Sequence, residues 1–146
     1  MPFSSANKGI PWVQLPEINE MNWGIHEGKS YAMWMEQPYK EAITDWQSGR
    51  YETRLENGES AAELAARMEL FMQWLENREE STILVCSHGR AMRCMMTYFF
   101  GLPVSEMEKF SHKNTGLYQF LKDQNGFNSI LMNDISHLNS DNGFPF

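Results

Sequence analysis

A short apolar run that ends in a Ser-His-Gly turn constrains this chain more than any other segment. Residues 82–86 read Thr-Ile-Leu-Val-Cys, and Ser-His-Gly follows at 87–89. Apolar side chains stand at consecutive positions, which is typical of a central strand with helices on both faces. Residues 91–100 then have the pattern of a helix that ends at Gly-Leu-Pro. The sequence therefore predicts a strand–turn–helix unit and an α/β fold class.

The predicted turn places His88 at a point where α/β proteins bind ligands, the carboxyl end of a strand. The free amides and positive dipole end of the following helix favour an anion such as phosphate. Gly89 lets the backbone approach that anion closely, and Arg90 and Arg93 add positive charge nearby. The alternative interpretation is that His88 is an ordinary histidine in a surface turn after a buried strand. A single histidine is weak evidence for a site, so this alternative stays open.

Acidic and aromatic residues lie close together near the start of the chain. Glu17, His26 and Glu27 fall within a dozen residues, with Trp23 among them. A carboxyl group in an aromatic pocket is poorly solvated and keeps its proton, which suits a general acid. The alternative is an acidic loop whose carboxylates cap helices or face water.

Residues 31–47 have a helical pattern that Pro38 interrupts. A proline inside a helix removes a hydrogen bond and clashes with the preceding turn, so the pattern predicts two short helices. Trp34 and Trp46 are expected to pack inward, and Gly49 is expected to end the second helix.

The clearest helix starts at Ser60, because Ser60-Ala61-Ala62-Glu63 has the pattern of a capping box. This helix is expected to run to about residues 76–78. Its predicted buried face carries five apolar side chains at helical spacing: Leu64, Met68, Phe71, Met72 and Leu75.

Two further patterns predict local structure in the second half of the chain. Ser105 and Glu108 have the spacing of a second capping box at the start of a helical turn. Residues 116–121 and 127–132 have the composition of two strands. Asn125-Gly126 between them is a strong hairpin signal.

Length and composition are those of one soluble domain. The chain has 146 residues, of which 42% are apolar, and we expect a single domain with an irregular lead-in over 1–14 and a loose tail over 139–146. The formal charge of −7 argues against a nucleic-acid binder or an anionic-membrane binder. Neither a signal peptide nor the roughly 18 apolar residues of a membrane span is present, so a cytoplasmic protein is expected.

The remaining reactive side chains do not form a recognisable site of another class. Cys86 and Cys94 are too few for a disulfide scaffold or a four-ligand zinc site, and we expect both to be reduced and buried. The four histidines are dispersed, with no pair at i,i+4 spacing, which argues against a metal centre. The Ser-His-Gly turn lacks the G-x-S-x-G pattern of a serine hydrolase.

Taken together and in order, these motifs resemble the histidine phosphatase superfamily, also called the phosphoglycerate mutase-like family. The similarity extends over about residues 15–135. The matching pieces are Leu15-x-Glu17-Ile18, Gly24-x-x-Glu27-Gly28, Asn57-Gly58-Glu59-Ser60 with Arg67, residues 83–89 with Arg93, and Asn114.

The resemblance implies a three-layer α/β/α sandwich of the phosphoglycerate mutase-like type, incomplete at its N-terminus. It implies that His88 hydrogen-bonds the phosphoryl oxygens and that Glu17 protonates the leaving alkoxide. Gly89 and Asn114 would line the phosphate pocket. The implied substrate is a phosphorylated small molecule, and the reaction is phosphomonoester hydrolysis or phosphoryl transfer without a metal or other cofactor.

The sequence departs from the family at the nucleophile. Family members begin with a strand that ends in Arg-His-Gly, and this chain contains no Arg-His-Gly. We therefore expect weak activity or none, because the acid and the stabilising histidine lack a group that attacks phosphorus. His26 is a poor substitute for the nucleophilic histidine. The alternative function is a non-catalytic module on a degenerate phosphatase fold, which binds a phosphorylated ligand or a protein.

The resemblance also has a structural consequence for residues 82–86. In the family the first strand lies beside the strand that ends at the Ser-His-Gly turn. Without it, an apolar strand edge would be exposed and open to pairing with another chain. We expect a homodimer through this edge, unless another segment holds it.

Overall fold

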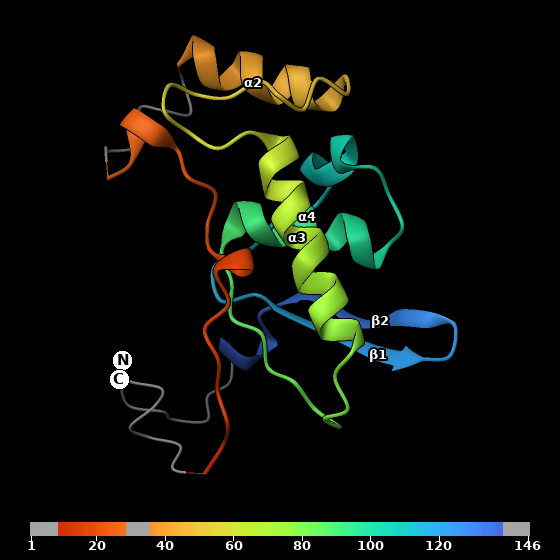
Figure 1. Cartoon of the computed structure of the whole chain (residues 1–146). Helices are drawn as coiled ribbons and strands as arrows, with labels where there is room; N and C mark the ends of the chain where they lie inside the picture. Colours follow the sequence, from red (N-terminus) through yellow and green to blue (C-terminus); the bar gives the residue numbers. More distant parts are fainter. Residues whose placement is uncertain (1–8, 29–35, 139–146) are drawn as a thin grey trace.

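The computed structural model describes residues 9–28 and 36–138, and helices dominate this part of the chain (Figure 1). None of the helices within these ranges is long and apolar enough to cross a membrane. The α-helices are α2 (Gln37–Gln47), α3 (Ala61–Glu76) and α4 (Gly89–Phe99), the strands are β1 (Leu117–Asp123) and β2 (Gly126–Asp134), and the 3-10 turns are Pro16–Ile18, Gly24–His26, Val104–Lys109 and Ser136–Leu138.

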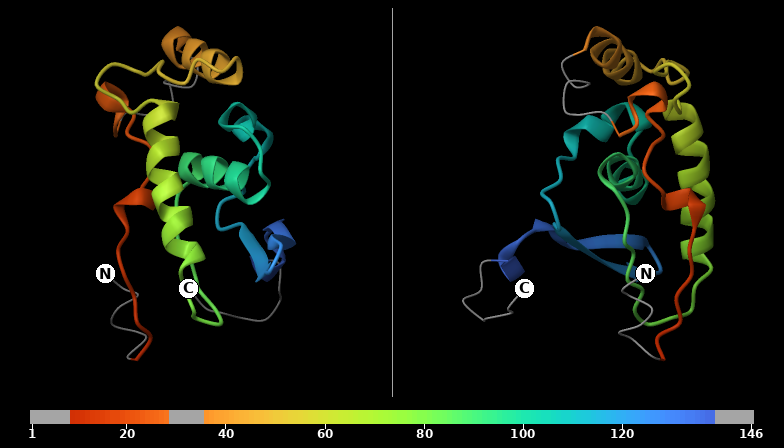
Figure 2. Two further views of the ribbon diagram at one scale, coloured as in Figure 1. Left: turned by 45° about the vertical axis from the view of Figure 1, so that its right-hand side comes forward. Right: turned by 90° about the vertical axis from the view of Figure 1, so that its left-hand side faces the viewer.

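Helix α3 is central, and its predicted start and buried face are confirmed. The Ser60 side chain accepts a hydrogen bond from the Glu63 amide at 3.2 Å, and the Glu63 carboxylate accepts one from the Ser60 amide at 2.9 Å. All five predicted apolar side chains are buried. Helix α4 crosses behind α3 (Figures 1 and 2), and the Tyr98 hydroxyl donates to the Ala65 carbonyl at 2.9 Å. The two helices therefore form the core that positions the candidate site.

Helix α2 differs from the two short helices that the sequence predicted. Pro38 lies in its first turn, where a proline needs no amide hydrogen bond, so it begins the helix instead of interrupting it. Trp46 is buried, and its indole donates to the Thr53 carbonyl at 2.7 Å. Gly49, with φ of +86°, follows the last turn as predicted. Trp34 lies outside the described residues.

Residues 82–86 are not a covered strand, and this prediction is wrong. Within the described ranges, no hydrogen bond pairs the backbone of this segment with another segment. Ile83 and Val85 pack against the core, whereas Leu84 is 67% exposed and Cys86 is also exposed. Cys94 alone of the two cysteines is buried. Among the described residues, no strand lies beside this segment, and its outward face is exposed.

The predicted hairpin is confirmed, with strands slightly longer than expected. β1 and β2 pair antiparallel and meet at Asp123 and Gly126, the latter with φ of +115°. Phe120 and Phe127 pack on Phe99 of α4. Their ring centroids lie 4.2 and 4.9 Å, respectively, from that of Phe99. The views in Figure 2 place residues 82–88 between this hairpin and the N-terminal segment.

The second capping box is absent. Residues Val104–Lys109 form a 3-10 turn whose N-cap is Pro103, and no side chain caps it. The Glu108 carboxylate binds Arg90 and Arg93 of α4 instead. Because these ion pairs occupy the carboxylate, it does not reach back to the amide of Ser105.

Candidate functional site

The first turn of α4 holds a carboxylate from a distant part of the chain, that of Glu20. Its oxygens accept hydrogen bonds from the Arg90 amide at 3.1 and 3.2 Å and from the Ala91 amide at 3.2 Å. If residue 89 had a side chain, its Cβ would lie 3.7 Å from Glu20 Oε2, so the carboxylate also lies against Gly89. The helix start therefore binds an anion, as its free amides and dipole favour, and the anion is internal.

His88 is the N-cap residue of α4 and has extended backbone, with φ of −124° and ψ of 168°. Its side chain is exposed and forms no hydrogen bond within the described part of the chain. The neighbouring Ser87 hydroxyl donates to the Ile18 carbonyl at 2.8 Å, which ties the turn to the loop that carries Glu20. The Glu20 carboxylate thus lies on the start of the helix whose N-cap residue is His88, and the His88 side chain is exposed to solvent.

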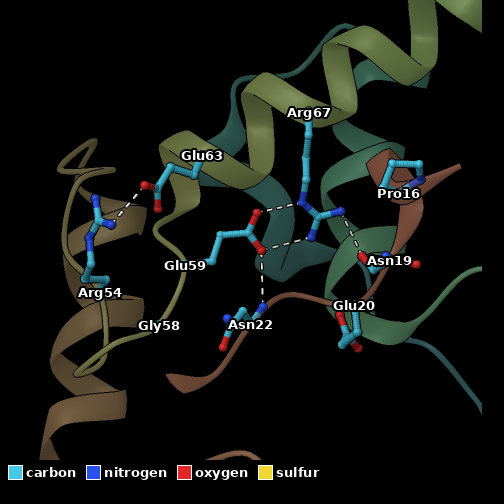
Figure 3. A pocket seen from close by; sticks show the side chains of 9 residues that line it. All are labelled: Pro16, Asn19, Glu20, Asn22, Arg54, Gly58, Glu59, Glu63 and Arg67. Carbon is cyan, nitrogen blue, oxygen red and sulfur yellow. Dashed lines mark hydrogen bonds and ion pairs between the residues drawn. The ribbon is translucent and has the colours of Figure 1, made fainter. Parts of the chain in front are cut away.

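A hollow of about 430 Å³ lies beside this loop (Figure 3). Both arginines that line it are paired with glutamates of the same wall: Arg54 with Glu63 at 2.9 Å and Arg67 with Glu59 at 2.6 Å. Because both guanidinium groups already bind carboxylates, the hollow offers no unpaired arginine to an anion. Its lining consists of Pro16, Asn19, Glu20, Asn22, Arg54, Gly58, Glu59, Glu63 and Arg67.

Comparison with known proteins identifies the family. The family model "Histidine phosphatase superfamily (branch 1)" matches residues 3–135. The chain belongs to the histidine phosphatase superfamily. Curated relatives include 6-phosphofructo-2-kinase/fructose-2,6-bisphosphatase of Caenorhabditis elegans, 32% identical over 90 residues (62% of this chain, 19% of the relative), and that of Gallus gallus, 31% identical over 99 residues (68% and 20%). The chain thus spans about a fifth of the length of these relatives.

Solved structures of histidine phosphatase fold confirm the α/β, phosphoglycerate mutase-like class. A putative α-ribazole-5'-P phosphatase from Escherichia coli superimposes with a TM-score of 0.73 at 24% identity, covering 88% of this chain and 64% of the other. The α-ribazole phosphatase from Shigella flexneri gives 0.71 at 22% identity, with the same coverage. At these identities the similarity concerns the fold.

The histidine phosphatase motifs do not all meet in the structure. Glu17 lies in the first 3-10 turn, and its Oε2 is buried without a hydrogen-bond partner in the described ranges. Within the same ranges, no hydrogen bond or ion pair joins Glu17 or the exposed Asn114 to His88 or Gly89. The structure brings Glu20, not Glu17, to the Ser-His-Gly turn.

A sequence signal for Glu20 did exist. The pattern of an apolar residue, any residue, Glu and an apolar residue occurs twice in succession, as Leu15-Pro16-Glu17-Ile18 and as Ile18-Asn19-Glu20-Met21. The two acids are three residues apart, and no local rule distinguishes them. Only the contact with α4 does.

Arg90 and Arg93, the positive charges expected beside the Ser-His-Gly turn, bind other side chains instead. Arg90 is only 6% exposed and binds Glu108 and the Tyr39 hydroxyl, the latter at 2.7 Å. Its guanidinium also lies over the ring of Trp23, 5.7 Å from the centroid. Burial lowers the pKa of Arg90. Arg93 binds the other oxygen of Glu108 at 2.6 Å. These arginines anchor α4, and backbone amides supply the polar contacts at its start.

His112 is a residue that sequence reasoning did not single out. Burial, and then the charge of Arg93, lower its pKa from 6.5 to about 4. The ring is therefore neutral at pH 7. Nδ1 shares a hydrogen bond of 2.5 Å with the Tyr118 hydroxyl, and Nε2 is buried without a partner among the described residues.

Proposed function

We propose that this chain carries the acid and the phosphoryl-binding part of a phosphomonoester-hydrolysing site, with Glu20 and His88 facing the substrate. One observation carries the proposal: the Glu20 carboxylate lies on the first amides of α4, and the N-cap residue of this helix is His88, whose exposed side chain has no hydrogen-bond partner among the described residues. The relatives support the substrate class, because their names are those of a fructose bisphosphatase and a ribazole phosphate phosphatase.

The proposed mechanism starts with competition between two anions. A phosphate dianion that reaches the helix start replaces Glu20 on the amides of Arg90 and Ala91. The displaced carboxylate then lies beside the dianion, whose charge favours protonation of Glu20. A water molecule attacks phosphorus opposite the ester oxygen and loses a proton to solvent. The bond between phosphorus and the ester oxygen breaks, Glu20 donates its proton to the leaving alkoxide, and an alcohol and inorganic phosphate are released. His88 and the helix amides hydrogen-bond the phosphoryl oxygens as their charge grows.

The attacking group limits the activity of this chain. These 146 residues contain no Arg-His-Gly, and we expect this chain by itself to hydrolyse phosphate esters slowly. This absence also favours the second candidate function, a non-catalytic module that binds a phosphorylated ligand through the same helix start. Turnover and binding distinguish the two.

The test is hydrolysis of β-glycerol phosphate, an alkyl phosphate whose leaving alkoxide needs a proton, by the wild type and three variants. Glu20→Gln and His88→Ala are expected to lower the rate by roughly 100-fold, because proton donation and oxyanion binding are lost. Glu17→Gln is the matched comparison, since it changes an acid three residues away, and it should retain most of the activity. A rate that falls with Glu17→Gln but not with Glu20→Gln would refute the assignment of Glu20.

A binding measurement completes the test. Inorganic phosphate should raise the Tm of the protein, and more strongly in Glu20→Ala, which removes the competing carboxylate. Stabilisation by phosphate without any turnover would establish the binding module. If neither stabilisation nor turnover is seen, no phosphate site exists at α4.

A further inference from the structure

We infer that Arg67 is a positioning residue for Glu20: together with Glu59, it fixes the loop over residues 17–22 so that the Glu20 carboxylate reaches α4. The role given to Glu20 rests on the proposed function, whereas the positioning itself rests on geometry. Arg67 lies in the middle of α3, and among the described residues no hydrogen bond joins its guanidinium to Glu20 or to α4.

The guanidinium of Arg67 holds the loop on the N-terminal side of Glu20 (Figure 3). Its Nη1 donates to the Glu17 carbonyl at 2.6 Å. It also donates to the Asn19 carbonyl at 2.8 Å, the bond that Figure 3 draws between these two residues. Both carbonyls lie at the end of a short 3-10 turn, where regular backbone pairing stops. Such carbonyls need donors from elsewhere, and Arg67 supplies them from a rigid helix.

The carboxylate of Glu59 holds the loop on the other side of Glu20. It binds Arg67 in a bidentate manner, at 2.6 Å to Nε and 2.9 Å to Nη2. Its Oε2 also accepts a hydrogen bond from the Asn22 amide at 3.2 Å, and the Glu59 amide donates to the Asn22 carbonyl at 2.8 Å. One ion pair therefore fixes residues 17, 19 and 22, and Glu20 lies within that span.

Arginine suits this position for a geometric reason. A guanidinium presents five N–H groups in a planar fork, so it can bind two carbonyls and both oxygens of a carboxylate at once. A lysine has three donors on one nitrogen and cannot reproduce this arrangement. The side chains of Arg67 and Glu59 are only 19% and 14% exposed, so solvent screens the pair weakly.

Arg54 provides a matched control. It lines the same hollow and pairs with the α3 carboxylate of Glu63 at 2.9 Å. Within the described ranges, Arg54 forms no hydrogen bond or ion pair with residues 17–22. Loss of Arg54 removes a more exposed ion pair from the same surface but leaves the loop fixed.

The test follows the Glu20 carboxyl through the amides that bind it. In the wild type at pH 7, the ¹H and ¹⁵N shifts of the Arg90 and Ala91 amides should reflect the bound Glu20 carboxylate. The amplitude of this effect is the shift difference between a protein with Glu20 and the same protein carrying Glu20→Gln. In Arg67→Met this amplitude should fall to less than about half, because the carboxylate spends less time on the helix. Arg54→Met should leave the amplitude unchanged. An unchanged amplitude in Arg67→Met, with the α3 amide signals intact, would overturn the inference.

Milder variants guard against a general loss of folding. Arg67→Lys and Glu59→Gln keep most of the volume and should each reduce the same amplitude, and retention of the wild-type amplitude in both would also overturn it. In the hydrolysis assay, Arg67→Lys should lower kcat by roughly 10- to 100-fold with little change in KM. If Glu20→Gln leaves hydrolysis intact while the amplitudes change as described, the proposed function fails and the positioning role stands.

Discussion

At the scale of single residues, the site depends on carboxylates and rings whose partners are far away in sequence. Glu20 binds amides 70 and 71 positions later, and the His112 ring is held neutral by its surroundings rather than by its neighbours in the chain. Burial of a titratable ring makes folding depend on pH, because the folded and unfolded states bind protons differently.

His112 should therefore make stability fall with acidity between pH 6.5 and about 4. In this window the unfolded chain binds a proton at His112 and the folded chain, with its pKa of about 4, does not. Protons thus favour unfolding, and stability present above pH 6.5 is lost as the pH falls. Allowing for the ring's partial exposure, the loss is about 2 kcal/mol.

Urea unfolding from pH 4.5 to 7.5 measures this dependence. His112→Gln, which stays neutral and can still bind the Tyr118 hydroxyl, should show a flatter curve than the wild type. His137→Gln alters an exposed histidine and is the control. Equal slopes for the wild type and His112→Gln would argue against a buried neutral ring.

At the scale of elements, one pattern had two different outcomes. Ser-x-x-Glu forms a capping box at Ser60 and Glu63, whereas Ser105 and Glu108 form none. In the first case the serine precedes a helix of 16 residues, and both side chains are close to the amides they cap. In the second, the glutamate is engaged by the arginines of α4. Tertiary contacts thus decide whether a local signal is used.

Alanine substitution of the two serines should separate these outcomes. Ser60→Ala removes a buried hydroxyl that binds the Glu63 amide, and it should destabilise the protein by about 1–2 kcal/mol. Ser105→Ala removes no cap and should change stability by less than about 0.5 kcal/mol. Thermal or urea unfolding of the two variants checks this. Similar losses in both would show that the second capping box does form.

At the scale of the whole molecule, residues 82–86 are an apolar segment that no described strand pairs with. Their backbone groups are unpaired within the described ranges, and Leu84 is exposed. An apolar edge of this kind pairs readily with another strand. We propose that a second copy covers it. In antiparallel pairing centred on Leu84, Glu80 of one copy meets His88 of the other, so the acidic end of each segment faces the start of the other α4.

Oligomeric state tests this proposal. The wild type should be a dimer by size-exclusion chromatography with light scattering, and Leu84→Asp should shift it to a monomer. Leu70→Asp is the control, because Leu70 is similarly exposed but lies on α3. A wild type that is monomeric at high protein concentration, or dissociation by both variants alike, would contradict pairing through residues 82–86.

The sequence by itself determined the features that depend on residues a few positions apart. The cap and apolar face of α3, the turn between β1 and β2, and the ordered motifs of the histidine phosphatase superfamily all belong to this group. Their hydrogen bonds or spacings lie within short windows, so composition and periodicity suffice to predict them.

Only the tertiary structure decided which acid reaches α4, which arginines are occupied and which face of residues 82–86 meets solvent. Glu17 and Glu20 are equivalent by pattern, and the difference arises from hydrogen bonds that span 70 residues and from an arginine 50 residues away. The exposure of Cys86 likewise depends on which segments lie beside it. Contacts of this range are set by how the elements pack together, and no local pattern in the sequence encodes them.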